Sequence, residues 1–178
     1  TGYYDVVQAI DLGRELLRRK QPGAARPWLE YAWSRDPWNS EAASALAEAL
    51  HRIEGGESAA ALLRTAIERN PHNPLLWEDL AVQYCLLGNW DLATDCFRKS
   101  EEIAPYRYER LLKWAQAMVR LRQYSRARKP IRNYLAAMPD DPEALALLAV
   151  IQQHRPEQSE PVDEPEPAQK PSRKFPWE

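Results

Sequence analysis

The sequence has few of the residues that form disulfides, metal sites and glycine-rich loops: of 178 residues, two are cysteine, three are histidine and six are glycine. Cys85 and Cys96 form no CxxC pair and no zinc-ligand grouping, so we expect two unpaired thiols that fill space on helices. Two cysteines also exclude a disulfide framework for a chain of this size. Reduced thiols favour a cytoplasmic location, and a signal or membrane anchor upstream of Thr1 stays open.

Signatures of membrane spans and of enzymes are also missing. No apolar run approaches the roughly 18 residues of a membrane-spanning helix. There is no GxSxG turn, no phosphate-binding glycine-rich loop and no HExxH motif, and the three histidines lie far apart in the sequence. We therefore expect no catalysis, no metal and no cofactor. A net charge of −2 also argues against a general nucleic-acid binder.

Proline, by contrast, is abundant and partly periodic. Four of the 15 prolines recur at a step of 34 residues, at Pro37, Pro71, Pro105 and Pro139. Two further series keep this step, at Ala25, Ala59, Ala93 and Ala127 and at Leu29, Leu63, Phe97 and Ile131. A period of this length, held without insertion, indicates an array of structural repeats.

Each 34-residue unit contains two windows with apolar residues at helical spacing, separated by a polar turn such as Gly88-Asn89. The periodic prolines end the second helix, because proline lacks an amide hydrogen and clashes with the preceding turn. Small residues recur where the two helices should approach each other, at Gly13, Ala47, Ala81 and Ala115. One such helix pair cannot bury its own apolar face, so neighbouring pairs must share a core.

Residues 74–107 resemble a tetratricopeptide repeat, with the characteristic residues at Trp77, Leu80, Ala81, Tyr84, Gly88, Ala93, Phe97 and Pro105. Segments 6–39, 40–73 and 108–141 match more loosely. The resemblance implies an all-α, right-handed solenoid of four helical hairpins within residues 1–155. It also implies a scaffold that binds other proteins in a concave groove.

Residues 142–154 repeat the first-helix pattern with Leu145, Leu148 and Ala149 and then stop. This predicts a capping helix, the ninth of the chain, with Asp140 and Asp141 serving its dipole. Pro27 and Pro130 fall inside second helices. We expect them to shorten these helices, with a bend as the alternative.

The last segment, 156–178, has six prolines and five acids between positions 157 and 166. It buries too little apolar surface to fold alone, so we expect an extended tail. Its end, Phe175-Pro176-Trp177, suits a docking motif, and a plain linker is the equal alternative. Self-association, with the tail of one copy in the groove of another, follows as one hypothesis.

The groove of such an array is lined by its first helices. On the face of these helices that points away from the second helices, the expected groove residues are Arg14, Arg18, Glu48, Arg52, Leu75, Val82, Leu86, Leu112, Val119 and Arg120, with Ile10, Leu17, Ser44, His51, Glu78, Cys85 and Gln116 beside them. This surface predicts a protein or peptide partner with apolar anchors and some acid. The alternative for the leucines is a place in the core between repeats. The cationic clamp that some family members use for chaperone C-termini is absent, because only Arg14 is cationic at the matching positions.

Residues 110–139 contain eight basic residues and no acid. The core of this basic patch is Arg122, Arg126, Arg128, Lys129 and Arg132. Its field would attract an anionic partner, such as an acidic protein, a membrane surface or the chain's own tail. Nucleic acid is a further anionic partner of this kind, and the less expected one because no recognisable nucleic-acid motif accompanies the basic residues.

Overall fold

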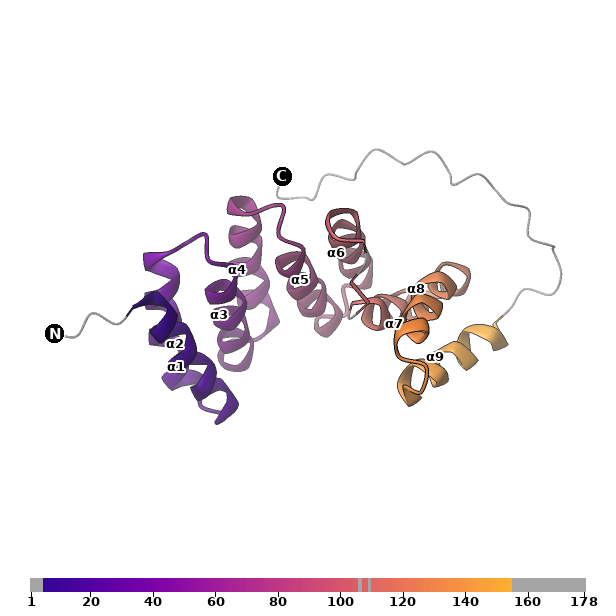
Figure 1. Cartoon of the computed structure of the whole chain (residues 1–178), viewed down its shortest axis with the longest axis horizontal. Helices are drawn as coiled ribbons and strands as arrows, with labels where there is room; N and C mark the ends of the chain where they lie inside the picture. The colour runs from indigo at the N-terminus through magenta and orange to yellow at the C-terminus, as the bar shows by residue number, and fades with distance from the viewer. Residues whose placement is uncertain (1–4, 106, 109, 155–178) are drawn as a thin grey trace.

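The computed structural model describes residues 5–105, 107–108 and 110–154, and these residues form nine helices and no strand. The helices are α1 (Val6–Arg18), α2 (Pro22–Arg35), α3 (Ser40–Ile53), α4 (Gly56–Arg69), α5 (Pro74–Leu86), α6 (Trp90–Ile103), α7 (Leu111–Arg120), α8 (Tyr124–Ala137) and α9 (Pro142–Gln153). They follow one another along the long axis of the molecule (Figure 1). The all-α repeat solenoid expected from the sequence is therefore confirmed.

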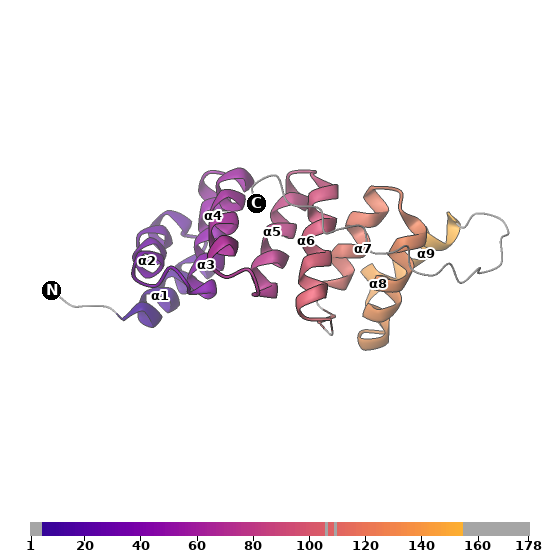
Figure 2. The same cartoon turned by 90° about the horizontal axis from the view of Figure 1, so that it is seen from above.

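Consecutive helices pack against each other throughout the array. In addition, first helices of successive pairs contact one another: α1 packs on α3, α3 on α5, and α7 on α9. Successive second helices have no comparable contact among the described residues. Successive helix pairs therefore lie closer together on the side of the first helices than on the side of the second helices. The elongated form of the array is visible in both views (Figures 1 and 2).

Three first helices, α3, α5 and α9, start at a capping residue that follows the 34-residue step, whereas Asp5 at the start of α1 makes no side-chain cap hydrogen bond. The Oδ1 atoms of Asn39 and Asn73 accept hydrogen bonds from the amides of Ala42 and Leu75, at 3.0 and 2.9 Å. Two steps further on, Asp141 caps α9 in the same way by accepting from Glu143 and Ala144. These side chains satisfy amides that a helix start leaves free, as expected for Asp141.

The member of this series at the third junction is Arg107, which has no side-chain acceptor and cannot cap a helix. Here the helix start is delayed: α6 ends at Ile103 and α7 begins only at Leu111, whereas α2 and α3 are separated by residues 36–39. The apolar core divides near this junction. One cluster centres on Phe97 and a second on Ile131, and half-buried Trp114 packs against both.

Gly13 lets α1 and α2 approach each other closely. A Cβ atom built on Gly13 would lie 2.5 Å from Leu29 Cδ2, and Leu29 is fully buried. A small residue is therefore required here, as the sequence predicted. The limiting contact is with the side chain of Leu29 in α2.

The prediction that Pro27 and Pro130 shorten their helices is wrong. Both lie inside 14-residue helices, α2 and α8, which match α4 and α6 in length. Each proline removes one internal hydrogen bond from its helix. Burial of Ala25 and Leu29 in α2, and of Ala127 and Ile131 in α8, holds these helices in place.

The inner face of α9 also differs from the expected one. Ala144 and Ile151 are fully buried, and Leu148 packs against the same cluster. Leu145 is 46% exposed and Ala149 is exposed, so the prediction that these two face the core is wrong. The start of α9 is fixed to α8 by Tyr134, whose hydroxyl donates to Asp141 Oδ2 at 2.7 Å.

Both cysteines are unpaired, as expected. Burial raises the pKa of Cys85 to about 11, and burial also raises the pKa of Cys96 well above its usual range. Both therefore stay protonated at neutral pH and act as small apolar side chains. None of the helices in the described part of the chain is long and apolar enough to cross a membrane.

Candidate interaction surface

The first helix α5 presents a line of apolar side chains to solvent. Leu75 is 44% exposed and Leu86 is 61% exposed, and Val82 lies half-buried between them. These positions are separated by seven and four residues, so they lie on one face of the helix. Asp79 falls on the same face, between Leu75 and Val82. The middle of the surface formed by the first helices is thus apolar, with one carboxylate in it.

The 34-residue step separates the predicted groove positions into two groups. The equivalent positions 14, 48, 82 and 116 are exposed or half-buried, and positions 18, 52, 86 and 120 are all exposed. At positions 10 and 112, in contrast, Ile10 is 3% and Leu112 is 9% exposed. The prediction that Ile10 and Leu112 line a groove is wrong, because both side chains are buried in the core clusters. Leu17, also assigned to the groove, is buried in the core as well.

The arginines beside the groove are already paired with acids of the chain. Arg14 forms an ion pair with Glu41, and Arg18 pairs with Glu15. Arg52 pairs with Glu48. It also donates to the backbone carbonyl of Leu17 at 2.8 Å. The predicted arginine-flanked groove therefore carries little free positive charge.

The fourth pair contributes less to this surface than the sequence suggested. The Arg120 guanidinium lies 5.7 Å from the ring centroid of Trp90, in a cation–π contact with the preceding pair. Val119 is half-buried and packs against the core cluster around Ile131. Gln116 donates a hydrogen bond to Glu143 of α9 at 2.6 Å.

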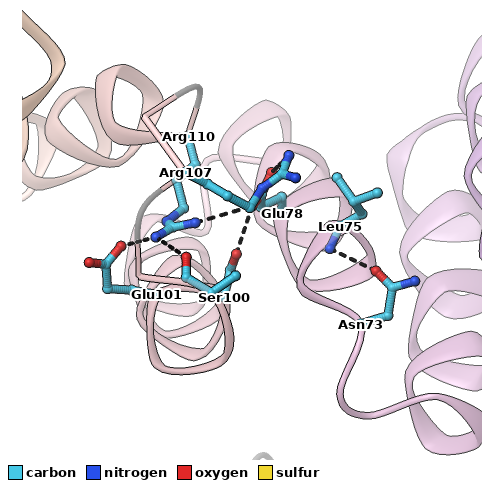
Figure 3. A network of polar contacts seen from close by, with 8 residues as sticks. Asn73, Leu75, Glu78, Ser100, Glu101, Arg107 and Arg110 are labelled. Carbon is cyan, nitrogen blue, oxygen red and sulfur yellow. Dashed lines mark hydrogen bonds and ion pairs between the residues drawn. The ribbon is translucent and has the colours of Figure 1, made fainter. Parts of the chain in front are cut away.

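Glu78, another predicted groove residue, belongs to a buried polar network at the third junction (Figure 3). Its carboxylate accepts from the Ser100 hydroxyl at 2.7 Å and from Arg107 Nε at 3.0 Å. Arg110, whose side chain is fully buried, contacts both Glu78 and Glu101. Arg110 also donates to the carbonyl of Ala104 at 2.7 Å, so the network ties the end of α6 to the start of α7. Burial lowers the pKa of Arg110, and Glu78 counteracts this shift.

Sequence reasoning missed two polar residues of α5, Asp79 and Gln83. Both line a pocket of about 260 Å³ between the first helices, which also involves Ser44, Glu48 and His51 of α3. The Ser44 hydroxyl donates to the Asp79 carboxylate. Burial raises the pKa of Asp79, and the nearby Glu78 and Glu48 add to that rise, while the hydrogen bond from Ser44 opposes it. A comparison of neighbouring repeats could have drawn attention to Asp79 and Gln83, because the equivalent positions one repeat earlier, 45 and 49, are both alanine.

The basic patch lies on a different face of the molecule. On the second helix α8, Ala127, Ile131 and Tyr134 are buried. At about 100° per residue the opposite side carries Lys129 and Arg132, with half-buried Arg128 beside them. Arg126 lies at the edge of this basic face and Arg122 precedes the helix, with both exposed. No ion pair among the described residues involves any of these five cations. The tail motif Phe175-Pro176-Trp177 lies outside the described residues, so its docking and the self-association hypothesis stay predictions.

Comparison with known proteins identifies the kind of array. The profile described as "Tetratricopeptide repeat" matches residues 62–95, which span one 34-residue period from within α4 to within α6. This match confirms the expected resemblance to a tetratricopeptide repeat over that period. The match begins in a second helix, so it covers the same period as the sequence pattern in a shifted register. No curated protein sequence matches the chain.

Solved tetratricopeptide structures share the fold at low sequence identity. A tetratricopeptide repeat protein from Parabacteroides merdae superposes with a TM-score of 0.70 at 17% identity, over 83% of this chain and 59% of that protein. A structure of MamA AMB-1 gives a TM-score of 0.70 at 19% identity, covering 82% of this chain and 86% of the other. A chain in the APC/C hetero-tetramer Cut9–Hcn1 gives 0.71 at 14% identity, over 82% of this chain and 29% of that one. These likenesses establish the fold.

Proposed function

We propose that this tetratricopeptide protein is a non-catalytic scaffold that holds a segment of another protein against the surface of its first helices. The observation that carries this proposal is the line of unpartnered apolar residues on α5, where Leu75 and Leu86 are 44% and 61% exposed. Large apolar side chains aligned on one helix face are a typical docking site for an amphipathic or extended segment. The Cut9–Hcn1 complex has a chain of the same fold within an assembly of several proteins.

The polar groups of the pocket support a non-catalytic role. Ser44 and His51 both line it, so a serine nucleophile activated by histidine is the reaction to consider. Ser44, however, donates its hydroxyl proton to Asp79, and His51 Nδ1 is buried without a hydrogen-bond partner. The serine–histidine hydrogen bond of an activated nucleophile is therefore not formed.

Site-specific photocrosslinking tests the proposed surface. A benzophenone amino acid is placed at Leu86 of α5 and, as a matched control, at the exposed Thr65 of α4. In cells of the native host, we expect a discrete protein crosslinked at Leu86 and not at Thr65. The double substitution Leu75→Asp and Leu86→Asp should abolish capture by a crosslinker at Val82. Equal capture at positions 86 and 65 would place the binding surface elsewhere.

The basic face of α8 favours a second candidate, an adaptor for an anionic partner. Arg128, Lys129 and Arg132 form no ion pair with an acid of the described residues, whereas Arg18 and Arg19 on α1 both pair with Glu15. We expect retention on heparin or on vesicles with acidic lipids at low salt, and loss of retention as salt screens the charges. Charge reversal at Lys129 and Arg132 should weaken retention more than the same change at Arg18 and Arg19. Absence of retention at low salt would dismiss this candidate.

A further inference from the structure

The pocket between α3 and α5 contains polar groups to which the described residues supply no hydrogen-bond partner. Gln83 is only 9% exposed, and its Oε1 atom is buried and accepts no hydrogen bond. His51 Nδ1 is also buried and unpaired. Both side chains line the same cavity of about 260 Å³. A buried polar atom without a partner costs stability, so its presence in a cavity points to a ligand that supplies the missing hydrogen bond.

The free charge in this pocket is negative. Asp79 accepts from the Ser44 hydroxyl, and no cation of the described residues forms an ion pair with it. The two other formally charged side chains of the lining are engaged elsewhere, Arg14 with Glu41 and Glu48 with Arg52. Burial raises the pKa of Asp79, and the hydrogen bond from Ser44 compensates its charged form only in part. A cation placed in the pocket would supply that compensation.

We propose that this pocket receives an arginine side chain from the bound protein segment, an inference that rests on the proposed function because it assigns one subsite of the same surface. A guanidinium group has five donors in a fixed plane, which suits a carboxylate, an amide oxygen and an imidazole nitrogen around one cavity. Lysine offers the same charge as a more strongly hydrated point and should bind less well. Because Asp79 lies between Leu75 and Val82 on one helix face, the segment carries its arginine between apolar residues.

This assignment reverses the charge expected from the sequence. The row of arginines along the first helices suggested a partner with acidic residues. Their ion pairs with Glu15, Glu41 and Glu48 remove that attraction, and the unpaired Asp79 favours a basic partner residue instead. An acidic side chain would meet a carboxylate without a counter-charge, which is unfavourable.

Titration with capped amino acids, followed by NMR of the isotope-labelled full chain, tests the subsite directly. The probes are N-acetyl-arginine methylamide, the lysine and glutamate equivalents, and citrulline, which keeps the arginine shape without its charge. We expect arginine to shift resonances of α3 and α5, including the Gln83 side-chain amide, with lysine weaker and with citrulline and glutamate inert. Equal effects of arginine and citrulline, or shifts confined to other helices, would overturn the proposal.

Two substitutions separate a ligand site from a structural role. Asp79→Asn and Gln83→Leu should each weaken arginine binding, by about tenfold for Asp79→Asn because a charge-assisted hydrogen bond is lost. Neither should lower the melting temperature, since each removes a group that the folded chain leaves uncompensated. Glu102→Gln, at an exposed acid of α6, is the matched control for binding and should leave the affinity for arginine unchanged. Unchanged arginine binding in both pocket variants would overturn the assignment.

The outcomes also separate this inference from the proposed function. If a partner crosslinks at Leu86 but arginine does not bind the pocket, the proposed scaffold function is supported and the proposed arginine subsite is contradicted. If arginine binds and nothing crosslinks at Leu86, the arginine subsite is supported and the proposed docking surface on α5 is contradicted. When both succeed, Asp79→Asn should reduce crosslinking of the partner at Leu86.

Discussion

Arg110 Nη1 lies 3.4 Å from Glu78 Oε1, although the two residues are 32 positions apart in the chain. The pair joins α5 to the start of α7 at the one junction whose capping position is not Asn or Asp. Arg107, which holds that position, binds Glu78 as well. Where the other junctions of the array use a capped helix start, this one uses a buried ion-pair network with Ser100 and Glu101.

This network should contribute measurably to stability. Arg110→Met is expected to lower the free energy of unfolding by about 3 kcal/mol, the low end for a broken buried pair, because Arg107 still neutralises Glu78. Urea unfolding followed by circular dichroism measures the loss. Arg98→Met is the control, since Arg98 pairs with Glu102 at the surface and should cost less than about 1 kcal/mol. Equal losses in the two variants would contradict a special role for the junction.

Two glycines in adjacent helices should respond oppositely to alanine. Gly13→Ala forces Leu29 to move, and the overpacking exceeds the gain in helix propensity, for a net loss of about 1 kcal/mol. Gly23→Ala meets no atom within 4 Å and should gain up to about 1 kcal/mol from propensity. Thermal unfolding of both variants gives the comparison. A stabilised Gly13→Ala protein would show that α1 and α2 are less tightly apposed.

The cap of α9 should make stability depend on pH in the acid range. The hydrogen bond from Tyr134, and then those from the Ala144 and Glu143 amides, lower the pKa of Asp141. Because the pKa of Asp141 is lower in the folded state, its carboxylate contributes fully to stability above the pKa of the unfolded state, about 3.9. This contribution is lost as pH falls through the pKa of the folded state. Asp141→Asn keeps the hydrogen-bond acceptor without the titration. The stability difference between the two proteins should therefore shrink below about pH 4, and a constant difference would refute this cause.

The two thiols should differ in reactivity in the native state. Cys85, with a pKa of about 11, is half-buried, and Cys96 is fully buried. At pH 7 iodoacetamide should modify Cys85 at least about tenfold more slowly than a free thiol, and Cys96 only after unfolding. Mass spectrometry of timed samples, with denatured protein as the control, reads out both sites. Native modification of Cys96 ahead of Cys85 would conflict with the structure.

Much of the fold could be predicted from the sequence because its causes are local and periodic. Prolines at the ends of second helices, small residues such as Gly13 between paired helices, and apolar residues at helical spacing recur every 34 residues. Each acts within its own hairpin or on the next one. Pro27 and Pro130 were misjudged because tertiary burial of the same helices outweighs the local cost of one lost hydrogen bond.

The candidate site could be predicted only in part. Leu75, Val82 and Leu86 lie on the surface of α5, as the helical period required, whereas Leu112 is buried. Periodicity gives the face that a residue occupies on its own helix. It does not give the area that the neighbouring pair covers, which depends on how one hairpin is rotated against the next.

The sequence by itself thus determined a helical repeat array, its period and the residues available to its first helices. Only the tertiary structure decided which of these remain accessible and which charges are free. In the sequence, the arginines of α1 and α3 and the acid Asp79 of α5 all count as charged residues, with nothing to show which of them is neutralised. Folding places the arginines beside acids and leaves Asp79 without a counter-charge among the described residues, because ion pairing depends on distances of a few ångströms between separate helices.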